Sequence, residues 1–190
     1  MKLRILLTAL VLASPLALIA TASDAPKPGA DETASITAFT EATRVFASPR
    51  CMNCHTTVAW PTQGDDRHRH TFNVARGPEN KGVPGMTCTN CHKDANQDAM
   101  TIPGAKDWQM APLSMGWTGL SPAQLCAALL DPKKNGGRTG DKVIEHMRDD
   151  RLVLWAWSPG GTRKPPALDH KAFVAALETW IKKGAHCPAA

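Results

Sequence analysis

Apolar residues recur at helical spacing in several segments of this chain. Near the N-terminal end, four apolar residues between Ile36 and Phe46 can line one face of a helix. This pattern predicts a helix over residues 36–47, which must end before Pro49 because a residue that precedes proline avoids the helical conformation. The sequence CMNCH follows this helix almost directly.

The last third of the chain predicts three more helices. The sequence SPAQ at residues 121–124 has the features of a helix start, with Ser as N-cap, Pro in the first turn and Gln three residues after the cap. That helix should end before Pro132. A second helix is expected over residues 141–148, and the longest over residues 170–183, where a glycine follows as the stop.

Between these helices the chain is rich in proline and glycine and lacks regular spacing. Residues 56–87 and 93–119 are therefore expected to form long irregular loops. The one strand signal is the apolar run at residues 152–157. Taken together, these patterns predict a mainly α protein with large loops.

The N-terminal residues have the features of an export signal. Lys2 and Arg4 precede an apolar stretch, which ends in an Ala-Thr-Ala cleavage pattern at Ala22. We expect residues 1–22 to be a signal peptide that is removed on export to the periplasm. The alternative is an uncleaved membrane anchor, for which the apolar run is only marginally long enough.

Cleavage after Ala22 would leave 168 residues, which fits one domain. Residues 23–35 are rich in Ala, Pro, Asp and Gly and are expected to be a disordered leader. Residues 36–190 are expected to form a single domain. No later segment is apolar for long enough to cross a bilayer, so no stable membrane insertion is expected.

Two copies of the pattern Cys-x-x-Cys-His are the most informative feature of the chain. CMNCH and CTNCH start 37 residues apart. In each copy two thiols can form thioether bonds to a haem, and the histidine can bind its iron, which is the attachment signature of c-type haem. The chain is therefore expected to hold two covalently bound haem c groups. The attachment residues are Cys51, Cys54, Cys88 and Cys91, and the proximal iron ligands are His55 and His92.

Cys-x-x-Cys pairs have two other common uses in proteins. A bare Cys-x-x-Cys also occurs in thioredoxin-like redox pairs, and two such pairs can form a zinc site. Four thiolate ligands on zinc would leave both histidines unused, and the repeat of the histidine in both copies favours haem.

The two remaining cysteines are Cys126 and Cys187. Two cysteines outside the motifs, in a protein exported to an oxidising compartment, favour a disulfide between them. This disulfide would tie the C-terminal tail to a helix in the middle of the chain. The alternative is a pair of unpaired buried thiols.

The net charge and composition of the chain bear on its partners and on how its core is filled. The formal net charge of +5 falls to +3 once Lys2 and Arg4 are removed with the signal peptide, which is too mild to indicate a nucleic-acid partner. The six Trp and the many Pro and Gly residues indicate loops that would not easily fill a core by themselves. Two buried porphyrins would supply the missing apolar surface.

No motif marks the distal iron ligands, and four residues are candidates. His70 in GDDRHRH is favoured and His68 is the fallback, because alternate residues of an extended segment point in opposite directions. His146 and Met115 are the other two, and the sequence PLSM around Met115 is similar to the loop that places a sulfur ligand in small cytochromes. Solvated histidines and a core methionine are the competing interpretations.

The number of candidate ligands bears on function. A six-coordinate haem iron mainly passes electrons, whereas an open iron can bind oxygen, peroxide or substrate. We therefore expect an electron-transfer protein without catalytic residues rather than an enzyme. The alternatives are a peroxidase-like or small-substrate dihaem oxidoreductase, and a haem-based sensor, for which no signalling domain is evident.

These residues resemble the c-type cytochromes, in which two terminal helices cross and loops wrap the haem. The segments APLSMGWTGLSPAQLC, HMRDDRLVLWAW and GAHCP are also similar to a family of small exported dihaem cytochromes that are labelled as accessory to isoquinoline oxidoreductase-type enzymes. The resemblance implies cytochrome c-like helices and redox partner proteins in the periplasm, among them a molybdenum-type dehydrogenase. The 37-residue spacing of the motifs is too short for two separate single-haem domains, so two neighbouring haems in one domain are expected.

Overall fold

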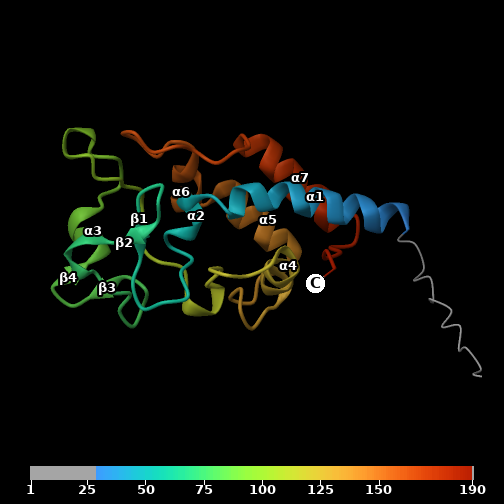
Figure 1. The fold of residues 1–190 in the computed structure, drawn as a ribbon, viewed down its shortest axis with the longest axis horizontal. Coiled ribbons are helices and arrows are strands. Elements are labelled where there is room, and N and C mark those ends of the chain that lie inside the picture. Colours follow the sequence, from blue (N-terminus) through green and yellow to red (C-terminus); the bar gives the residue numbers. More distant parts are fainter. Residues whose placement is uncertain (1–28, 190) are drawn as a thin grey trace, which may run out of the picture.

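The computed structural model describes residues 29–189, so the predicted signal peptide and residues 23–28 of the expected leader lie outside the described residues (Figure 1). The described chain is mainly helical, as the sequence predicted. Its long axis runs from a helical end to an end made of loops (Figure 1). The main helices are α1 (Ala30–Phe46), α4 (Pro122–Leu130), α5 (Gly140–Asp149) and α7 (His170–Lys182), and the short ones are α2 (Pro49–Met52), α3 (Cys88–Cys91) and α6 (Arg151–Leu154).

Helix α1 begins earlier than the sequence pattern indicated. It starts at Ala30 rather than at Ile36, so the last six residues of the expected disordered leader are helical. Acidic residues in the first turn favour a helix N-terminus because they face its positive dipole end. Ser35, within this extension, is fully buried and donates a hydrogen bond of 2.9 Å to the Trp180 carbonyl. Tertiary contacts therefore hold a segment that composition alone assigned to disorder.

The helix predictions for the last third agree with the structure. Helix α4 begins at Pro122 with the predicted capping box, in which the side chains of Ser121 and Gln124 each accept a hydrogen bond from the other's backbone N–H. Helices α5 and α7 match the predicted ranges to within a residue at each end. Gly184 lies in the left-handed region (φ +103°), which is the usual conformation of a residue that ends a helix.

The predicted strand at residues 152–157 is wrong. This segment forms α6 and a 3-10 turn at Trp155–Trp157. The Asp150 carboxylate accepts hydrogen bonds from the backbone N–H groups of Leu152 (2.8 Å) and Val153 (3.2 Å), and so caps the helix N-terminus.

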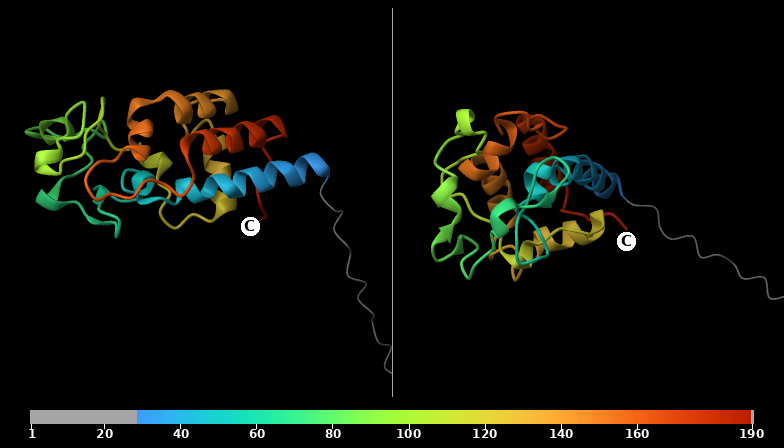
Figure 2. Two further views of the ribbon diagram at one scale, coloured as in Figure 1. Left: turned by 90° about the horizontal axis from the view of Figure 1, so that it is seen from above. Right: turned by 60° about the vertical axis from the view of Figure 1, so that its left-hand side comes forward.

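The core of the helical end is aromatic. Helices α1 and α7 lie side by side (Figure 2), and Phe39 of α1 packs on Trp180 of α7 with ring centres 4.8 Å apart. Phe46, at the end of α1, meets Phe173 edge to face at 5.3 Å. All four rings are at most 1% exposed. Burying each such side chain contributes about 1.5–3 kcal/mol, so this packing fixes α1 and the residues that follow it.

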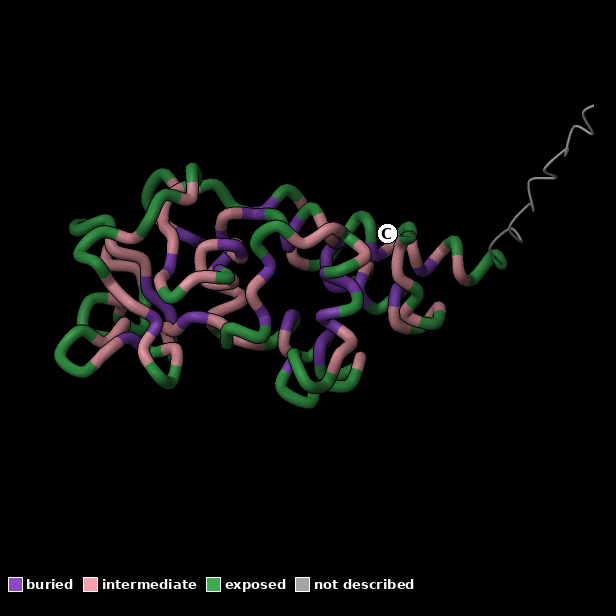
Figure 3. The backbone as a smooth tube through the Cα atoms, turned by 60° about the horizontal axis from the view of Figure 1, so that its bottom comes forward, coloured by how far each residue is buried: buried purple, intermediate pink, exposed green. Residues whose placement is uncertain are grey.

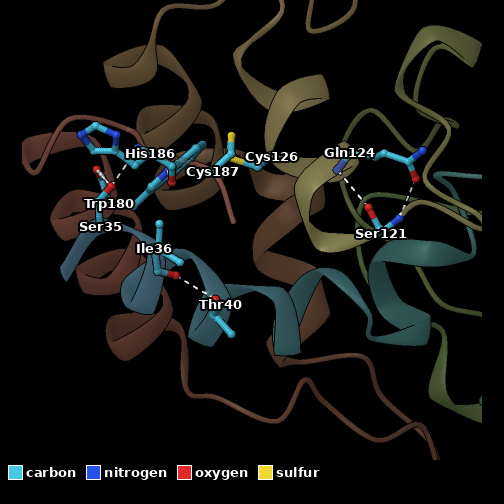
Figure 4. Close-up of a disulfide and its surroundings, with 9 residues drawn as sticks. All are labelled: Ser35, Ile36, Thr40, Ser121, Gln124, Cys126, Trp180, His186 and Cys187. Carbon is cyan, nitrogen blue, oxygen red and sulfur yellow. Dashed lines mark hydrogen bonds between the residues drawn. A yellow bond between two sulfur atoms is a disulfide. The ribbon is translucent and has the colours of Figure 1, made fainter. Parts of the chain in front are cut away.

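The predicted disulfide between Cys126 and Cys187 is confirmed (Figure 4). It ties the C-terminal tail to α4, across a sequence separation of 61 residues. Around it, Ser35 accepts a hydrogen bond of 2.9 Å from the His186 backbone N–H, and the Trp180 indole donates one of 3.2 Å to the His186 carbonyl. The tail is thus fastened to both α1 and α7.

The other end is built from loops and two small antiparallel hairpins, in the region that was predicted to be irregular. Its backbone is mostly exposed or half-buried (Figure 3). Gly85 takes a φ of +82° in the turn between β3 and β4, which a residue with a side chain rarely adopts. The hairpins are β1 (Thr62–Gln63) with β2 (His68–Arg69), and β3 (Gly82–Val83) with β4 (Met86–Thr87).

None of the helices within residues 29–189 combines the length and the apolar character that a bilayer span needs.

Candidate haem sites

The first motif is presented by the helix that follows α1. Ser48 caps α2 by accepting a hydrogen bond from the Arg50 backbone N–H (3.2 Å), and Pro49 occupies the first turn, where its missing N–H costs nothing. Cys51 therefore lies on a helical turn, with Cys54 and His55 just beyond it. Because α1 is fixed by the aromatic core, this motif is held at the edge of that core.

His55 has two partners from a distant loop. Its Nδ1 lies 2.7 Å from the Met115 carbonyl oxygen, which can only accept, so Nδ1 carries the proton and Nε2 keeps a free lone pair. The Trp117 ring stacks on the imidazole at 3.4 Å between centres, with 16° between planes. Together the carbonyl and the indole set both the tautomer and the orientation of the ring.

The second motif has the same arrangement, built from different residues. Cys88 and Cys91 lie on α3, which follows β4 directly. The Nδ1 of His92 donates to the Pro103 carbonyl oxygen (2.7 Å), and the Trp108 ring stacks on the imidazole at 4.4 Å with 9° between planes. Each predicted proximal histidine thus presents Nε2, as a metal-bound histidine does when its other nitrogen is held by a carbonyl.

Burial determines the charge state of these side chains. It lowers the pKa of His55 to about 3, against the opposing effect of the hydrogen bond to Met115, and it also lowers the pKa of His92. Both imidazoles are therefore neutral at pH 7, as metal ligation requires. Burial raises the pKa of Cys51 to about 12 and that of Cys54 to about 11, which is the reverse of the shift in a thioredoxin-like reactive pair.

Each motif opens into its own cavity, and the two cavities adjoin. The first, of about 580 Å³, contains Cys51, Cys54 and His55, and the second, of about 1030 Å³, contains Cys88 and Cys91 with His92. Volumes of this order are typical of cofactor and ligand sites. The side chains that line both cavities are Arg50, Cys54, Trp108, Gln109, Met110 and Trp155.

The walls fit a large apolar group that carries a few acidic substituents. Four tryptophans line one or both cavities: Trp108, Trp117, Trp155 and Trp157. Two buried donors in these walls, Arg50 Nε and Trp117 Nε1, have no hydrogen-bond partner among the described residues. Within residues 29–189, no three His, Cys, Asp or Glu side chains are grouped so that they could hold a metal ion by themselves. The four motif thiols are thus not gathered as they would be in a zinc site.

The two histidines of GDDRHRH differ in their surroundings. Both line the larger cavity. His70 has its ring centre 6.0 Å from that of His92, and its Nδ1 lies 2.8 Å from the Thr71 carbonyl, which leaves Nε2 unused. In His68 both ring nitrogens are engaged, one with Asp66 (2.6 Å) and the other with Gln63 (3.0 Å).

The other two candidate ligands, His146 and Met115, line the smaller cavity together with His55. His146 lies on α5, and its Nδ1 is 3.3 Å from Asp150 Oδ2 one turn later. Hydrogen bonding to His146 lowers the pKa of Asp150, so that carboxylate is ionised at pH 7 and can accept the imidazole proton. Met115 is buried, and its backbone carbonyl is the one that holds Nδ1 of His55.

Arg76 lines neither cavity. It is buried and donates to the backbone carbonyls of Thr56, Val58 and Ala111. It therefore joins the segment after the first motif to the loop that supplies Met115. Sequence reasoning passed over Arg50, and only its position next to Cys51 could have drawn attention to it.

Comparison of the chain with protein-family models, with curated proteins and with solved structures gives no match.

Proposed function

We propose that the protein is an exported dihaem c-type cytochrome, which transfers single electrons between redox partners in the periplasm. The observation that carries the proposal is the duplicate environment of the two motifs. In each, the histidine donates Nδ1–H to a backbone carbonyl at 2.7 Å and stacks on a tryptophan, although the partners come from different loops. Bound haem iron changes between its ferric and ferrous forms and so takes up and releases one electron.

The distance between His70 and His92 supports a second histidine ligand on the haem of the second motif. An imidazole nitrogen binds a transition metal at about 2.1 Å. The 6.0 Å between the two ring centres would leave room for one metal ion held by both histidines. His70 also has Nε2 free, whereas both nitrogens of His68 are in use.

For the haem of the first motif, the contacts favour His146 over Met115. The iron would bind Nε2 of His55, and the distal ligand must approach from beyond the iron. The Met115 backbone lies on the opposite, Nδ1 side of His55, where its carbonyl holds the ring. His146 faces the same cavity, and Asp150 orients it as a carboxylate orients many metal-bound histidines.

Two six-coordinate haems in adjoining cavities suit electron transfer rather than chemistry on a substrate. The two cavities share a wall, so two haems bound there would lie next to each other. The disulfide is consistent with an oxidising compartment such as the periplasm. The partners would then be periplasmic redox proteins, with a molybdenum-type dehydrogenase as one candidate donor.

Carbon monoxide binding tests this function, because the gas binds only ferrous haem with an open or displaceable sixth position. The reduced protein should bind none at neutral pH. His70→Gly and His146→Gly should each bind one equivalent, since each removes one distal ligand. His68→Gly and Met115→Leu are the matched controls and should leave binding and the visible spectrum unchanged.

Stoichiometric binding by the unaltered protein would contradict the carrier function and favour a dihaem enzyme with an open iron. If His70→Gly or His146→Gly failed to bind the gas, the corresponding ligand assignment would be wrong.

A further inference from the structure

Arg50 is the one charged side chain among the described residues that lines both cavities. It comes immediately before the first haem-attachment cysteine, and its side chain is only 1% exposed. Its guanidinium carbon lies 5.9 Å from the ring centre of Trp155, which is another residue of the shared wall. A full positive charge is therefore buried between the two sites.

The neutralisation of this charge is incomplete. Nη2 donates to the Gly64 carbonyl (3.2 Å) and to Asp65 Oδ1 (2.5 Å), while Nε is buried without a partner. The Asp65 side chain is 40% exposed, so water screens its negative charge far more than it screens Arg50. Seen from the two cavities, Arg50 and Asp65 together should therefore act as a net positive charge.

We propose that Arg50 is a shared electrostatic control element, which raises the reduction potentials of both haems together. The inference rests on the proposed function, since it needs a haem at each motif. Reduction adds one negative charge to each haem, and a nearby cation stabilises the reduced form. The effect is large only where the cation is poorly screened, because the interaction energy varies inversely with the effective dielectric constant. A buried arginine in the wall between the sites meets that condition for both haems.

Arg163 provides a contrast within the same molecule. It lines only the larger cavity, and its guanidinium donates to the backbone carbonyls of Thr101, Pro159 and Gly160. Removal of its charge should therefore affect the haem of the second motif more than the haem of the first. Arg50 should affect both.

The test is a spectroelectrochemical titration of the purified holoprotein, in which two one-electron steps are resolved. Arg50→Gln should lower both potentials. We expect a change on the order of tenfold in the ferrous-to-ferric ratio of each haem at a fixed ambient potential, which is about 59 mV for a one-electron couple. Asp65→Asn should raise both potentials, because it removes the negative charge that partly offsets Arg50. Arg163→Gln should lower mainly one step.

The opposite signs separate charge from structure. If the Arg50–Asp65 pair served only to hold the fold, breaking it from either side would move the potentials in the same direction. Potentials that stay unchanged in Arg50→Gln, or that fall in Asp65→Asn, would overturn the inference while leaving the two-haem function intact. If Arg50→Gln gave no holoprotein, Asp65→Asn would decide the question alone. A wild-type protein without covalent haem would instead overturn the proposed function itself.

Discussion

The two ends of the molecule build the same local site in different surroundings. At the helical end, CMNCH follows α1 directly and lies against a core of rings that are almost fully buried. At the loop end, CTNCH lies on a four-residue helix between a small hairpin and an irregular loop, and Cys91 is exposed. Yet both histidines meet a carbonyl and a tryptophan in the same way.

The comparison shows which features each motif needs and which it does not. If the motifs hold haem as proposed, each brings its own covalent attachment and proximal ligand, so the surrounding fold has only to orient the imidazole and close the cavity. A preformed core can do this, and so can loops that gain apolar contacts from the cofactor. We therefore expect the first site to depend on the stability of the helical core, and the second to depend more on its own haem.

Removal of the disulfide should give the largest loss of stability and should affect the helical end. The double variant Cys126→Ala/Cys187→Ala frees the C-terminal tail from α4. Opening a loop of this length should reduce the free energy of unfolding by about 4 kcal/mol on the chain-entropy model. Guanidinium titration of the holoprotein measures the loss.

If the second motif holds a haem as proposed, its spectrum should be unchanged in this variant, since the described side-chain contacts of His92 are with His70, Pro103 and Trp108 and none is with the tail. A comparable disturbance at both haems would argue against two separately supported sites.

Removal of the tryptophan that stacks on each motif histidine should give the next largest loss of stability. The two variants compare the two ends of the molecule directly. Trp117 is 3% exposed and also meets Phe46 edge to face at 5.4 Å, so Trp117→Ala opens a cavity in the core and should cost about 3 kcal/mol. Trp108 is only half-buried and packs on His92 and on Trp155. Trp108→Ala should cost about 1 kcal/mol, which is the scale of an aromatic pair contact.

Unfolding titrations of the two variants, measured side by side, check this order. Equal losses would show that the loop end has a core of its own.

The sequence could predict the features that are set by residues close together in the chain or by the number of residues of one type. The two motifs are visible as pentapeptides, the start of α4 follows from the local capping box, and the disulfide follows from the count of cysteines. The apolar run at residues 152–157 was misleading, because Asp150 caps a helix there and none of the strands described within residues 29–189 pairs with it.

The partners of the motif histidines could not be predicted in this way. The Met115 carbonyl is 60 residues from His55, and the Pro103 carbonyl is 11 residues from His92. Every residue has a carbonyl, so no residue type marks the partner in the sequence. The buried position of Arg50 between the two cavities likewise arises only when distant loops meet.

The most direct test of the central claim is the intact mass of the denatured protein, made in cells that carry the machinery for haem attachment. We expect the mass of the mature polypeptide plus two haems, and one haem fewer in each of the variants Cys51→Ala/Cys54→Ala and Cys88→Ala/Cys91→Ala. A mass equal to that of the polypeptide alone, or one unaffected by these substitutions, would show that the motifs do not attach haem.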